Sequence, residues 1–548
     1  MTYLITGGCC SDASCVEVCP VDCIRPRPGD VDFLTAEQLY IDPETCIDCG
    51  ACQDACPVSA VQSQWDVPDD LRDSFAVNAS YFEENPRDHY SLSPDREPHH
   101  LPHGSTIRVA IVGTGPAGCY AAAQLSEIDG VEVSLFDRLP TPFGLVRAGV
   151  APDHAKTKLI TESFGQALAR SNVSCYFNVE VGRDLAVDEV LEHHDAIIWA
   201  GGATSDRRLN VPGEDLDGCF SAREFVAWYN GHPDHSDCTF DLSSTTAVVI
   251  GNGNVALDVA RILAQPAEAL SGTDIAAHAL TALENSAVRK VIVTGRRGPE
   301  YATYTSGELA SLTRTLGVNV SAKQTETQHL ADRTDRNSML ILSLPETTEH
   351  AGGITFRFGL APQSIAGNDS VEQVVFQHAD GQLEVIATSL VFKAIGYRGR
   401  EVTSLPFDET LGTLPNVAGR VIDPESGDPL VGVYCSGWIK RGPTGTIGTN
   451  RVDSAETVEA LLEDFAAGRL VRPVTHREDF DALVGSRVTQ VVRYTDWLAI
   501  DHAERSAGMA AGRPRQKLVM IEELLCTIPS AGHTQAAAPN SAPEGGLV

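Results

Sequence analysis

Cysteines are concentrated at the start of this 548-residue chain, where nine of the 15 fall within the first 56 residues. The segment CIDCGACQDACP at residues 46–57 has the spacing of the bacterial iron–sulfur ligand run, including the proline that ends it. Paired CxxC motifs also form closed zinc sites. The third cysteine in register and the two Cys-Pro dipeptides favour iron–sulfur clusters over zinc.

The same run occurs once more, 37 residues earlier. The shift places three cysteines of the earlier run on three of the later run: Cys9 on Cys46, Cys15 on Cys52, and Cys19 on Cys56. Asp12 takes the place of Cys49. The segment is therefore an internal duplication, and in such duplications the fourth cysteine of each run binds the other cluster.

Because each run gives its fourth cysteine to the other cluster, the sequence predicts two metal sites with different ligands. A complete [4Fe–4S] cluster is expected on four thiolates, those of Cys19, Cys46, Cys49 and Cys52. The other site has the three thiolates of Cys9, Cys15 and Cys56, with Asp12 where the fourth is expected. Because a hard carboxylate is a poor substitute for a thiolate on iron, we expect [3Fe–4S], or [4Fe–4S] with a labile iron bound by Asp12 or water. Cys10 is an alternative to Cys9, and Cys23 lies outside the register.

A glycine-rich loop follows the apolar segment IRVAIVG and precedes a predicted helix. Its glycines are Gly113, Gly115 and Gly118, and this arrangement directs backbone N–H groups at a pyrophosphate. Asp137 ends the next predicted strand, where it can accept hydrogen bonds from a ribose. The pattern predicts a dinucleotide site, and an unliganded glycine turn is the alternative.

A second loop of this kind, GNGNVA at residues 251–256, lies further along the chain. The strand after it ends not in an acid but in Arg296 and Arg297. Two guanidinium groups there suit a ribose 2′-phosphate by charge and geometry. The sequence predicts NADP(H) rather than NAD(H), unless the arginines only belong to a solvated loop.

The charge balance excludes other classes of protein. Asp and Glu number 74 against 41 Lys and Arg, giving a net charge of −33, so nucleic acid is not an expected partner. No apolar run has the ~18 residues of a membrane span, and a cytoplasmic location without membrane insertion is expected. Residues 1–62 carry ten acids and two arginines, which predicts a matching basic patch on this protein or its partner.

Several longer motifs resemble the adrenodoxin reductase family of ferredoxin–NADP reductases. They are TPFGLVRAGVAPDH (141–154), NVPGEDL (210–216), GRRGP (295–299) and GWIKRGPTGTIGTN (437–450), in addition to the two glycine loops. The N-terminal segment, including CVEVCPVDCI at 15–24, resembles the seven-iron bacterial ferredoxins. The whole chain is therefore similar to the fused ferredoxin/ferredoxin–NADP reductases of the mycobacterial type.

This resemblance implies positions for both nucleotides. FAD would be contacted by residues around the first glycine loop and by a later loop: Ala117, Asp137, Leu145, Val181, Trp438, Gly445, Thr446 and Ile447. NADPH would be contacted by Asn252, Gly253, Asn254, Val255, Arg296, Arg297, Glu308 and Gly445. The family often has Glu where Asp137 stands, and EYATYTSGEL at 300–309 departs from the family's more apolar helix start.

The resemblance also pairs His154 with Glu308 beside the nicotinamide, to orient the ring or relay a proton. A loop-capping role for His154, after Pro152 and Asp153, is the alternative.

The expected architecture is an α+β ferredoxin-like domain followed by two α/β Rossmann-type domains of the glutathione reductase kind. The predicted boundaries are a ferredoxin domain at 1–65, a linker at 66–104, an FAD-binding domain at 105–206 and 396–470, an NADP-binding domain at 207–395, and a C-terminal extension with a disordered tail at 471–548. We expect a monomer.

The expected activity is electron transfer from NADPH through FAD to the clusters, and then to an external ferredoxin or another one-electron acceptor. One rival is the electron-input subunit of a larger enzyme, similar to the small subunit of glutamate synthase. A second is a disulfide reductase, which would need a CxxC motif that the chain lacks after residue 56. A third is an electron carrier whose α/β part binds no FAD.

Overall fold

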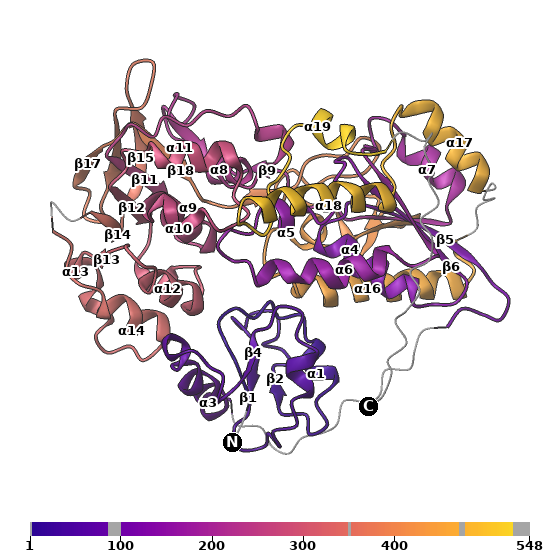
Figure 1. Cartoon of the computed structure of the whole chain (residues 1–548), viewed down its shortest axis with the longest axis horizontal. Coiled ribbons are helices and arrows are strands. Elements are labelled where there is room, and N and C mark those ends of the chain that lie inside the picture. The colour runs from indigo at the N-terminus through magenta and orange to yellow at the C-terminus, as the bar shows by residue number, and fades with distance from the viewer. Residues whose placement is uncertain (1–2, 86–99, 349–351, 471–476, 530–548) are drawn as a thin grey trace, which may run out of the picture.

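The computed structural model describes residues 3–85, 100–348, 352–470 and 477–529. These residues form three parts: a cysteine-rich unit at 3–85, a unit built on a seven-stranded sheet, and a unit built on a six-stranded sheet. Figure 1 shows the two sheet-containing units side by side, with the cysteine-rich unit beneath both of them.

The cysteine-rich unit contains two short antiparallel ribbons and two short helices. Strand β1 (Tyr3–Ile5) pairs with β4 (Val61–Ser63), and β2 (Ile24–Arg25) pairs with β3 (Tyr40–Ile41). Helix α1 (Ser14–Glu17) belongs to the first cysteine run and α2 (Ala51–Asp54) to the second. Each ribbon joins strands that lie far apart in the sequence, so the unit closes on itself.

The internal duplication is also present in the backbone. Three non-glycine residues of the first run have positive φ angles: Ser11 at 57°, Ala13 at 65° and Asp22 at 54°. The residues 37 positions later do the same: Asp48 at 61°, Gly50 at 79° and Ser59 at 52°. Because a positive φ is uncommon outside glycine, three matching pairs show that both runs fold into the same loop.

The predicted linker at 66–104 is wrong in its first part. Residues Asp69–Leu71 form a 3₁₀ turn and Ser74–Glu84 form helix α3. The Asn78 side chain is only 3% exposed; it accepts from the backbone N–H groups of Ile5 and Ile41 and donates to the Ile5 carbonyl. A buried amide with three strand contacts makes the helix part of the cysteine-rich unit, and residues 86–99 lie outside the described part of the chain.

The seven-stranded sheet has the order β20-β21-β22-β8-β5-β6-β7. Its five parallel strands are largely apolar: β5 (Ile107–Val112), β6 (Val131–Asp137), β7 (Val173–Phe177), β8 (Ala196–Trp199) and β22 (Pro429–Cys435). Strands β20 (Asn416–Val417) and β21 (Arg420–Ile422) add an antiparallel edge. The helices of this unit are α4 (Pro116–Ser126), α5 (Gly144–Ala148), α6 (Ile160–Leu168), α7 (Val187–His193), α15 (Trp438–Arg441) and α16 (Thr449–Ala466).

The six-stranded sheet has the order β10-β18-β11-β12-β14-β13 and is parallel throughout. Its strands are β10 (Cys219–Ser221), β11 (Thr246–Ile250), β12 (Lys290–Gly295), β13 (Val320–Ala322), β14 (Gly353–Phe358) and β18 (Leu390–Lys393). Its helices include α8 (Ala222–Tyr229), α9 (Asn254–Ala264), α11 (Ala277–Glu284), α12 (Ser306–Thr313) and α14 (Arg336–Ser343). A small antiparallel sheet is formed by β15 (Ala361–Ala366), β16 (Gln373–Gln377) and β17 (Leu383–Ala387).

The chain passes between the two large sheets twice. Strand β9 (Ser205–Asp206) lies where it leaves the first sheet, and β19 (Tyr397–Arg398) lies where it returns. The two strands pair with each other, so both crossings run through one narrow connection.

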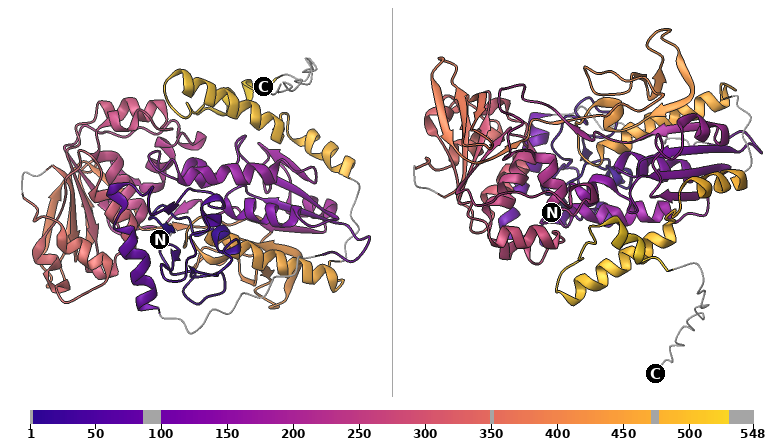
Figure 2. Two further views of the ribbon diagram at one scale, coloured as in Figure 1. Left: turned by 60° about the horizontal axis from the view of Figure 1, so that its bottom comes forward. Right: turned by 90° about the horizontal axis from the view of Figure 1, so that it is seen from above.

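The C-terminal segment contains α17 (Arg477–Arg487), α18 (Tyr494–Ala510) and α19 (Ile521–Cys526). In Figure 1 and Figure 2, α18 runs along both sheet-containing units. Glu504 of α18 is paired with Arg147, and Lys517 is paired with Asp274, so the segment joins the two units through buried ions. Within the described residues, no helix is both long and apolar enough to cross a membrane. The tail from residue 530, predicted to be disordered, lies outside the described residues.

Candidate redox sites

The thiols of the cysteine-rich unit gather around two small cavities. The first is bordered by Cys9, Cys15 and Cys56, together with Cys10 and Asp12. The second is bordered by the remaining cysteines of the unit: Cys19, Cys23, Cys46, Cys49 and Cys52. Cys56 therefore lies with the first run and Cys19 with the second, which is the exchange that the duplicated sequence predicts. The assignment of individual ligands stays a prediction.

Backbone N–H groups point at sulfur in both places. Cys23 N–H donates to the Sγ of Cys19 at 3.4 Å, and Ala60 N–H donates to the Sγ of Cys56 at 3.2 Å. These donors are also 37 residues apart. At the first cavity, Ser11 N–H donates to the Sγ of Cys9 at 3.3 Å. Such bonds stabilise charge on a thiolate, so the donor set suits iron–sulfur clusters, whose potentials depend on them.

Burial makes two of these thiols, those of Cys9 and Cys52, hard to ionise without a metal. It raises the pKa of Cys9 to about 11 and the pKa of Cys52 to about 12. A thiol of this kind is a poor nucleophile at neutral pH, whereas a bound metal stabilises its thiolate form. The residues therefore fit the clusters that the sequence predicts.

The first glycine loop connects β5 to α4 by a turn that only glycine allows. Gly113 has φ of 104°, and a Cβ there would lie 2.5 Å from the Ala200 carbonyl oxygen. A Cβ on Gly118 would lie 1.9 Å from the Gly113 oxygen. Gly115, by contrast, has open space on that side at the start of α4. The loop thus places backbone that carries no side chains at a helix N-terminus, and this arrangement suits a pyrophosphate.

Asp137 lies beside this loop at the end of β6. Its carboxylate accepts from the Thr114 N–H and the Leu139 N–H, at 3.0 Å each, and from the Thr114 hydroxyl. Burial raises the pKa of Asp137, and these donors offset part of that effect. The carboxylate is thus held at the loop, in the position from which a ribose is contacted.

The later loop that the resemblance assigns to the flavin packs against the same helix. A Cβ on Gly437 would lie 2.6 Å from the Cβ of Ala117. Trp438 donates from its indole to the Thr444 carbonyl at 3.2 Å and stacks on Tyr397. Gly445, Thr446 and Ile447 follow, between α15 and α16. Of the other predicted FAD contacts, Leu145 is 42% exposed in α5, whereas Val181 is buried.

The second glycine loop connects β11 to α9. Gly251 has φ of 128°, and a Cβ there would lie 2.1 Å from the Ala394 oxygen. Asn254 accepts from the Thr305 N–H at 2.9 Å, which ties the start of α9 to the segment before α12. Asn252, Gly253 and Val255 belong to the same turn. The loop therefore has the geometry that a second nucleotide needs.

The two predicted arginines lie at the same edge of the sheet. Ile250 of β11 is opposite Thr294 of β12, so the glycine loop and Arg296 leave adjacent strands at their carboxyl ends. Arg296 and Arg297 are exposed, and the Arg297 guanidinium lies 4.7 Å from the centre of the Tyr301 ring. Two exposed guanidinium groups next to the loop are available for a phosphate.

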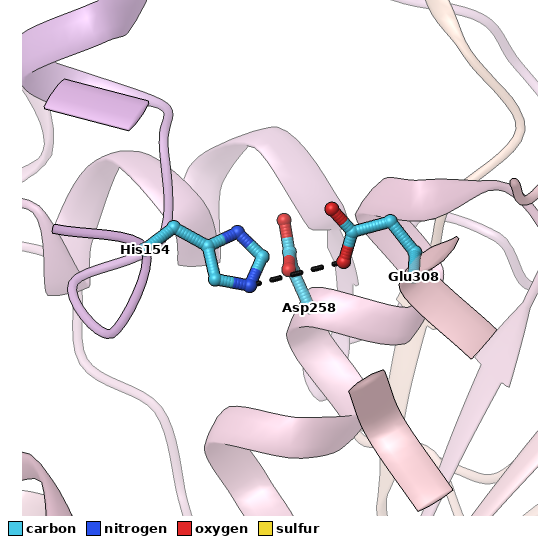
Figure 3. Close-up of side chains that lie close together, drawn as sticks. All are labelled: His154, Asp258 and Glu308. Carbon is cyan, nitrogen blue, oxygen red and sulfur yellow. Dashed lines mark ion pairs between the residues drawn. The ribbon is translucent and has the colours of Figure 1, made fainter. Parts of the chain in front are cut away.

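Figure 3 shows His154, Asp258 and Glu308 pointing toward one another from three elements. The Nε2 of His154 lies 3.8 Å from a Glu308 carboxylate oxygen. Burial and the nearby Asp258 carboxylate raise the pKa of Glu308, whereas His154 lowers it. The predicted pair is thus brought together from distant parts of the sequence. Its catalytic role stays a prediction.

Asp258 is the member of this group that the sequence reasoning missed. It pairs with Arg261 at 2.6 Å, and Arg261, which is 2% exposed, also binds Asp153. Asp258 lies four residues after Asn254 on α9, so both are on one helix face. That spacing was the available signal, because it places a carboxylate next to the predicted nucleotide loop.

The cysteine-rich unit contacts both sheet-containing units. The Cys10 carbonyl accepts from the Thr446 hydroxyl at 2.9 Å and from the Gly448 N–H at 2.8 Å. On the other side, Glu37 accepts from the Ser306 N–H at 2.9 Å. Acids of the unit also meet basic side chains: Glu17 meets Arg451, and Asp73 meets Arg336 and Arg314. The expected basic groups are therefore present within this chain.

Comparisons with known proteins agree with this arrangement. Residues 107–437 match the pyridine nucleotide-disulphide oxidoreductase family, and residues 39–62 match the 4Fe-4S binding domain. The chain is 44% identical to a "Probable ferredoxin/ferredoxin--NADP reductase" of Mycobacterium tuberculosis, over 97% of this chain and 96% of that protein. The relative of the same name in Mycobacterium leprae is 42% identical, with 97% of this chain and 98% of that one covered.

A solved structure gives the same result. It is titled "Mycobacterium tuberculosis FprA in complex with NADPH"; it is 38% identical to this chain and has a TM-score of 0.72. The match covers 77% of this chain and 99% of FprA. The chain therefore belongs to the pyridine nucleotide-disulphide oxidoreductase family and, within it, to the fused ferredoxin/ferredoxin–NADP reductases.

Proposed function

We propose that this protein is an FAD-dependent ferredoxin–NADP(+) reductase. In this proposal it transfers electrons from NADPH, via FAD, to iron–sulfur clusters in its own N-terminal unit and to one-electron acceptors such as ferredoxin. The observation that carries the proposal is the contact of Cys10 with Thr446 and Gly448, since it joins the loop proposed to bind a cluster to the loop proposed to border the flavin.

Separate sets of residues would bind the two nucleotides. Gly113, Gly115 and Gly118 would hold the FAD pyrophosphate, and Asp137 its ribose. Trp438 and the loop at 445–447 would border its ring system. When bound, FAD supplies the conversion between a hydride and single electrons, which neither thiolates nor carboxylates can perform.

His154 and Glu308 would border the nicotinamide. Because burial and Asp258 raise the pKa of Glu308, its carboxyl keeps a proton to higher pH than an exposed glutamate does. His154, at 3.8 Å, can share that proton and orient the ring. Arg261 holds Asp258 in place beside them.

The two cysteine groups would hold two clusters. Cys19, Cys46, Cys49 and Cys52 suit [4Fe–4S], and Cys9, Cys15 and Cys56 suit [3Fe–4S] or a labile [4Fe–4S]. Cys10, which borders the same cavity, is the alternative to Cys9 as the ligand. The proposed FAD-binding domain comprises residues 105–206 and 396–470, and the proposed NADP-binding domain comprises residues 207–395.

The proposed location is the cytoplasm, and the proposed oligomeric state is a monomer. Gel filtration tests the latter against obligate assembly with a larger subunit.

The test of this function is NADPH-dependent reduction of cytochrome c and of a ferredoxin by the full chain. Replacing Arg296 and Arg297 by Gln should raise the KM for NADPH about tenfold to a hundredfold, because charged hydrogen bonds to the 2′-phosphate are lost. The KM for NADH should stay as it is. An equal rise in the KM for NADPH and for NADH would refute the assignment of the two arginines to the 2′-phosphate. A lower KM of the native protein for NADH than for NADPH would refute it as well.

A further inference from the structure

The first cysteine run has a carboxylate where the second has a thiol, although the two loops share one backbone conformation. Ser11 and Ala13, which flank Asp12, match Asp48 and Gly50, which flank Cys49, in their positive φ angles. Asp12 therefore occupies the position in its loop that Cys49, which borders the second cavity, occupies in the second loop. The hydrogen-bond and ion-pair partners of Asp12 indicate its role.

Both oxygens of the Asp12 carboxylate have partners. Oδ1 accepts from the Ser14 N–H at 3.0 Å. Oδ2 accepts from the Tyr120 hydroxyl at 3.4 Å and lies 3.7 Å from a guanidinium nitrogen of Arg451. Asp12 borders the first cavity, but none of these three partners does. The side chain is 7% exposed, so water does not compete for it.

The two distant partners lie on the two helices that adjoin the proposed flavin site. Tyr120 lies in α4, the helix that begins at the first glycine loop. Arg451 lies in the first turn of α16, directly after the loop at 445–448. A single carboxylate thus joins the first cysteine run to both elements.

Arg451 strengthens this junction through further contacts with the same loop. Its guanidinium donates to the Asp12 carbonyl at 3.0 Å and to the Ser14 hydroxyl at 3.1 Å, and it pairs with Glu17 at 2.8 Å. Beside it, Gly448 packs so closely that a Cβ would lie 2.2 Å from the backbone of Ser11 and Asp12. A side chain at position 448 would therefore not fit against this loop.

We propose that Asp12 is a positioning residue that holds the first cysteine run against α4 and α16, and that it is not an iron ligand. This proposal rests on the proposed function, since it concerns a site assigned to a cluster. It leaves that cluster with three protein ligands, and it makes the missing fourth thiol part of the contact between the two units.

The test compares three variants of the full chain. Asp12→Asn keeps the shape of the side chain and removes its charge, and Tyr120→Phe removes only a hydroxyl that no iron could use. Asp48→Asn, an exposed acid in the second run, is the matched control. The readouts are iron content, the electron paramagnetic resonance spectrum of the oxidised protein, and hydrogen exchange of peptides covering 9–15 and 446–452.

We expect Asp12→Asn to keep the iron content and spectrum of the native protein while amide exchange in both peptides becomes about tenfold faster. Tyr120→Phe should give a smaller increase, about fivefold, also with an unchanged spectrum. Asp48→Asn should change neither readout.

Loss of iron or a changed first-cluster spectrum in Asp12→Asn would overturn the proposal, because a ligand would then have been removed. Unchanged exchange in both Asp12→Asn and Tyr120→Phe would overturn it as well. Native protein without iron would instead defeat the proposed function, so the two failures are distinguishable.

Discussion

The two cysteine runs share a backbone and differ in what surrounds it. In the first run Ser11, Asp12 and Ala13 are buried, and Asp12 contacts α4 and α16, whereas Asp48 and Cys49 of the second run are exposed. Duplication explains the shared loop, because the backbone is set by local residue conformations. The fourth position of the first run thus lies in an interface, and the fourth position of the second run lies at the surface.

The side chain at the fourth position has a different role in each run. A soft thiol at the fourth position completes a cluster, whereas a carboxylate with charged partners secures an interface. The first run lies against Thr446 and Gly448, and the second has the exposed Ile47 on the rim of its cavity. One run thus faces inward and the other faces solvent, where an external acceptor can approach.

The largest effect should come from separating the first run from its neighbour. Gly448→Val places side-chain atoms where the backbone of Ser11 and Asp12 lies, which costs about 1–3 kcal/mol or more in the docked state. We expect cluster reduction by NADPH, followed in a stopped-flow instrument, to become much slower. Reduction of bound FAD by NADPH should slow much less than reduction of the clusters.

Gly8→Ala is the control, because its added Cβ meets nothing within 4 Å and Gly8 is not among the glycines with positive φ. Equal rates of cluster reduction in Gly448→Val and native protein would show that this contact does not matter for electron transfer.

A second effect should distinguish the two fourth positions directly. Cys49→Ser removes a proposed ligand, so the second cluster should lose at least about one iron per chain and change its absorption. Asp12→Ser should leave the iron content as it is. Iron analysis together with visible absorption measures both, and a similar iron loss in the two variants would mean that both positions bind metal.

The smallest effect should come from the exposed ion pair at the edge of the interface. Glu17→Gln removes the partner of Arg451, and since Glu17 is mostly exposed, the loss should be about 0–1 kcal/mol. The thermal transition of the cysteine-rich unit should shift only slightly in low salt and not at all in high salt. A large shift that persists in high salt would show that this pair contributes more than an exposed ion pair does.

The sequence predicted the parts that depend on local spacing. The cysteine register, both glycine loops and the strands that precede them follow from patterns of a few residues, and the structure contains each of them. The pairing of His154 with Glu308 came from resemblance rather than from spacing, and the structure places them together.

Contacts between distant segments were not predictable in the same way. Nothing near Asp12 indicates Tyr120 or Arg451, which lie 108 and 439 positions away. Helix α3 was missed because residues 74–84 adjoin a stretch rich in Pro, Asp and His, and its packing depends on one amide, Asn78, that binds two strands. Asp258 was missed although its spacing from Asn254 was visible.

The central claim is that the first run is a cluster loop whose fourth position serves the interface. Asp12→Cys tests it most directly, because the matching backbone lets a cysteine at position 12 reach iron as Cys49 does. The account predicts a spectrum with two four-iron clusters, each on four thiolates, and about one additional iron per chain if the native first cluster is [3Fe–4S]. Iron content and a spectrum identical to those of the native protein would contradict it.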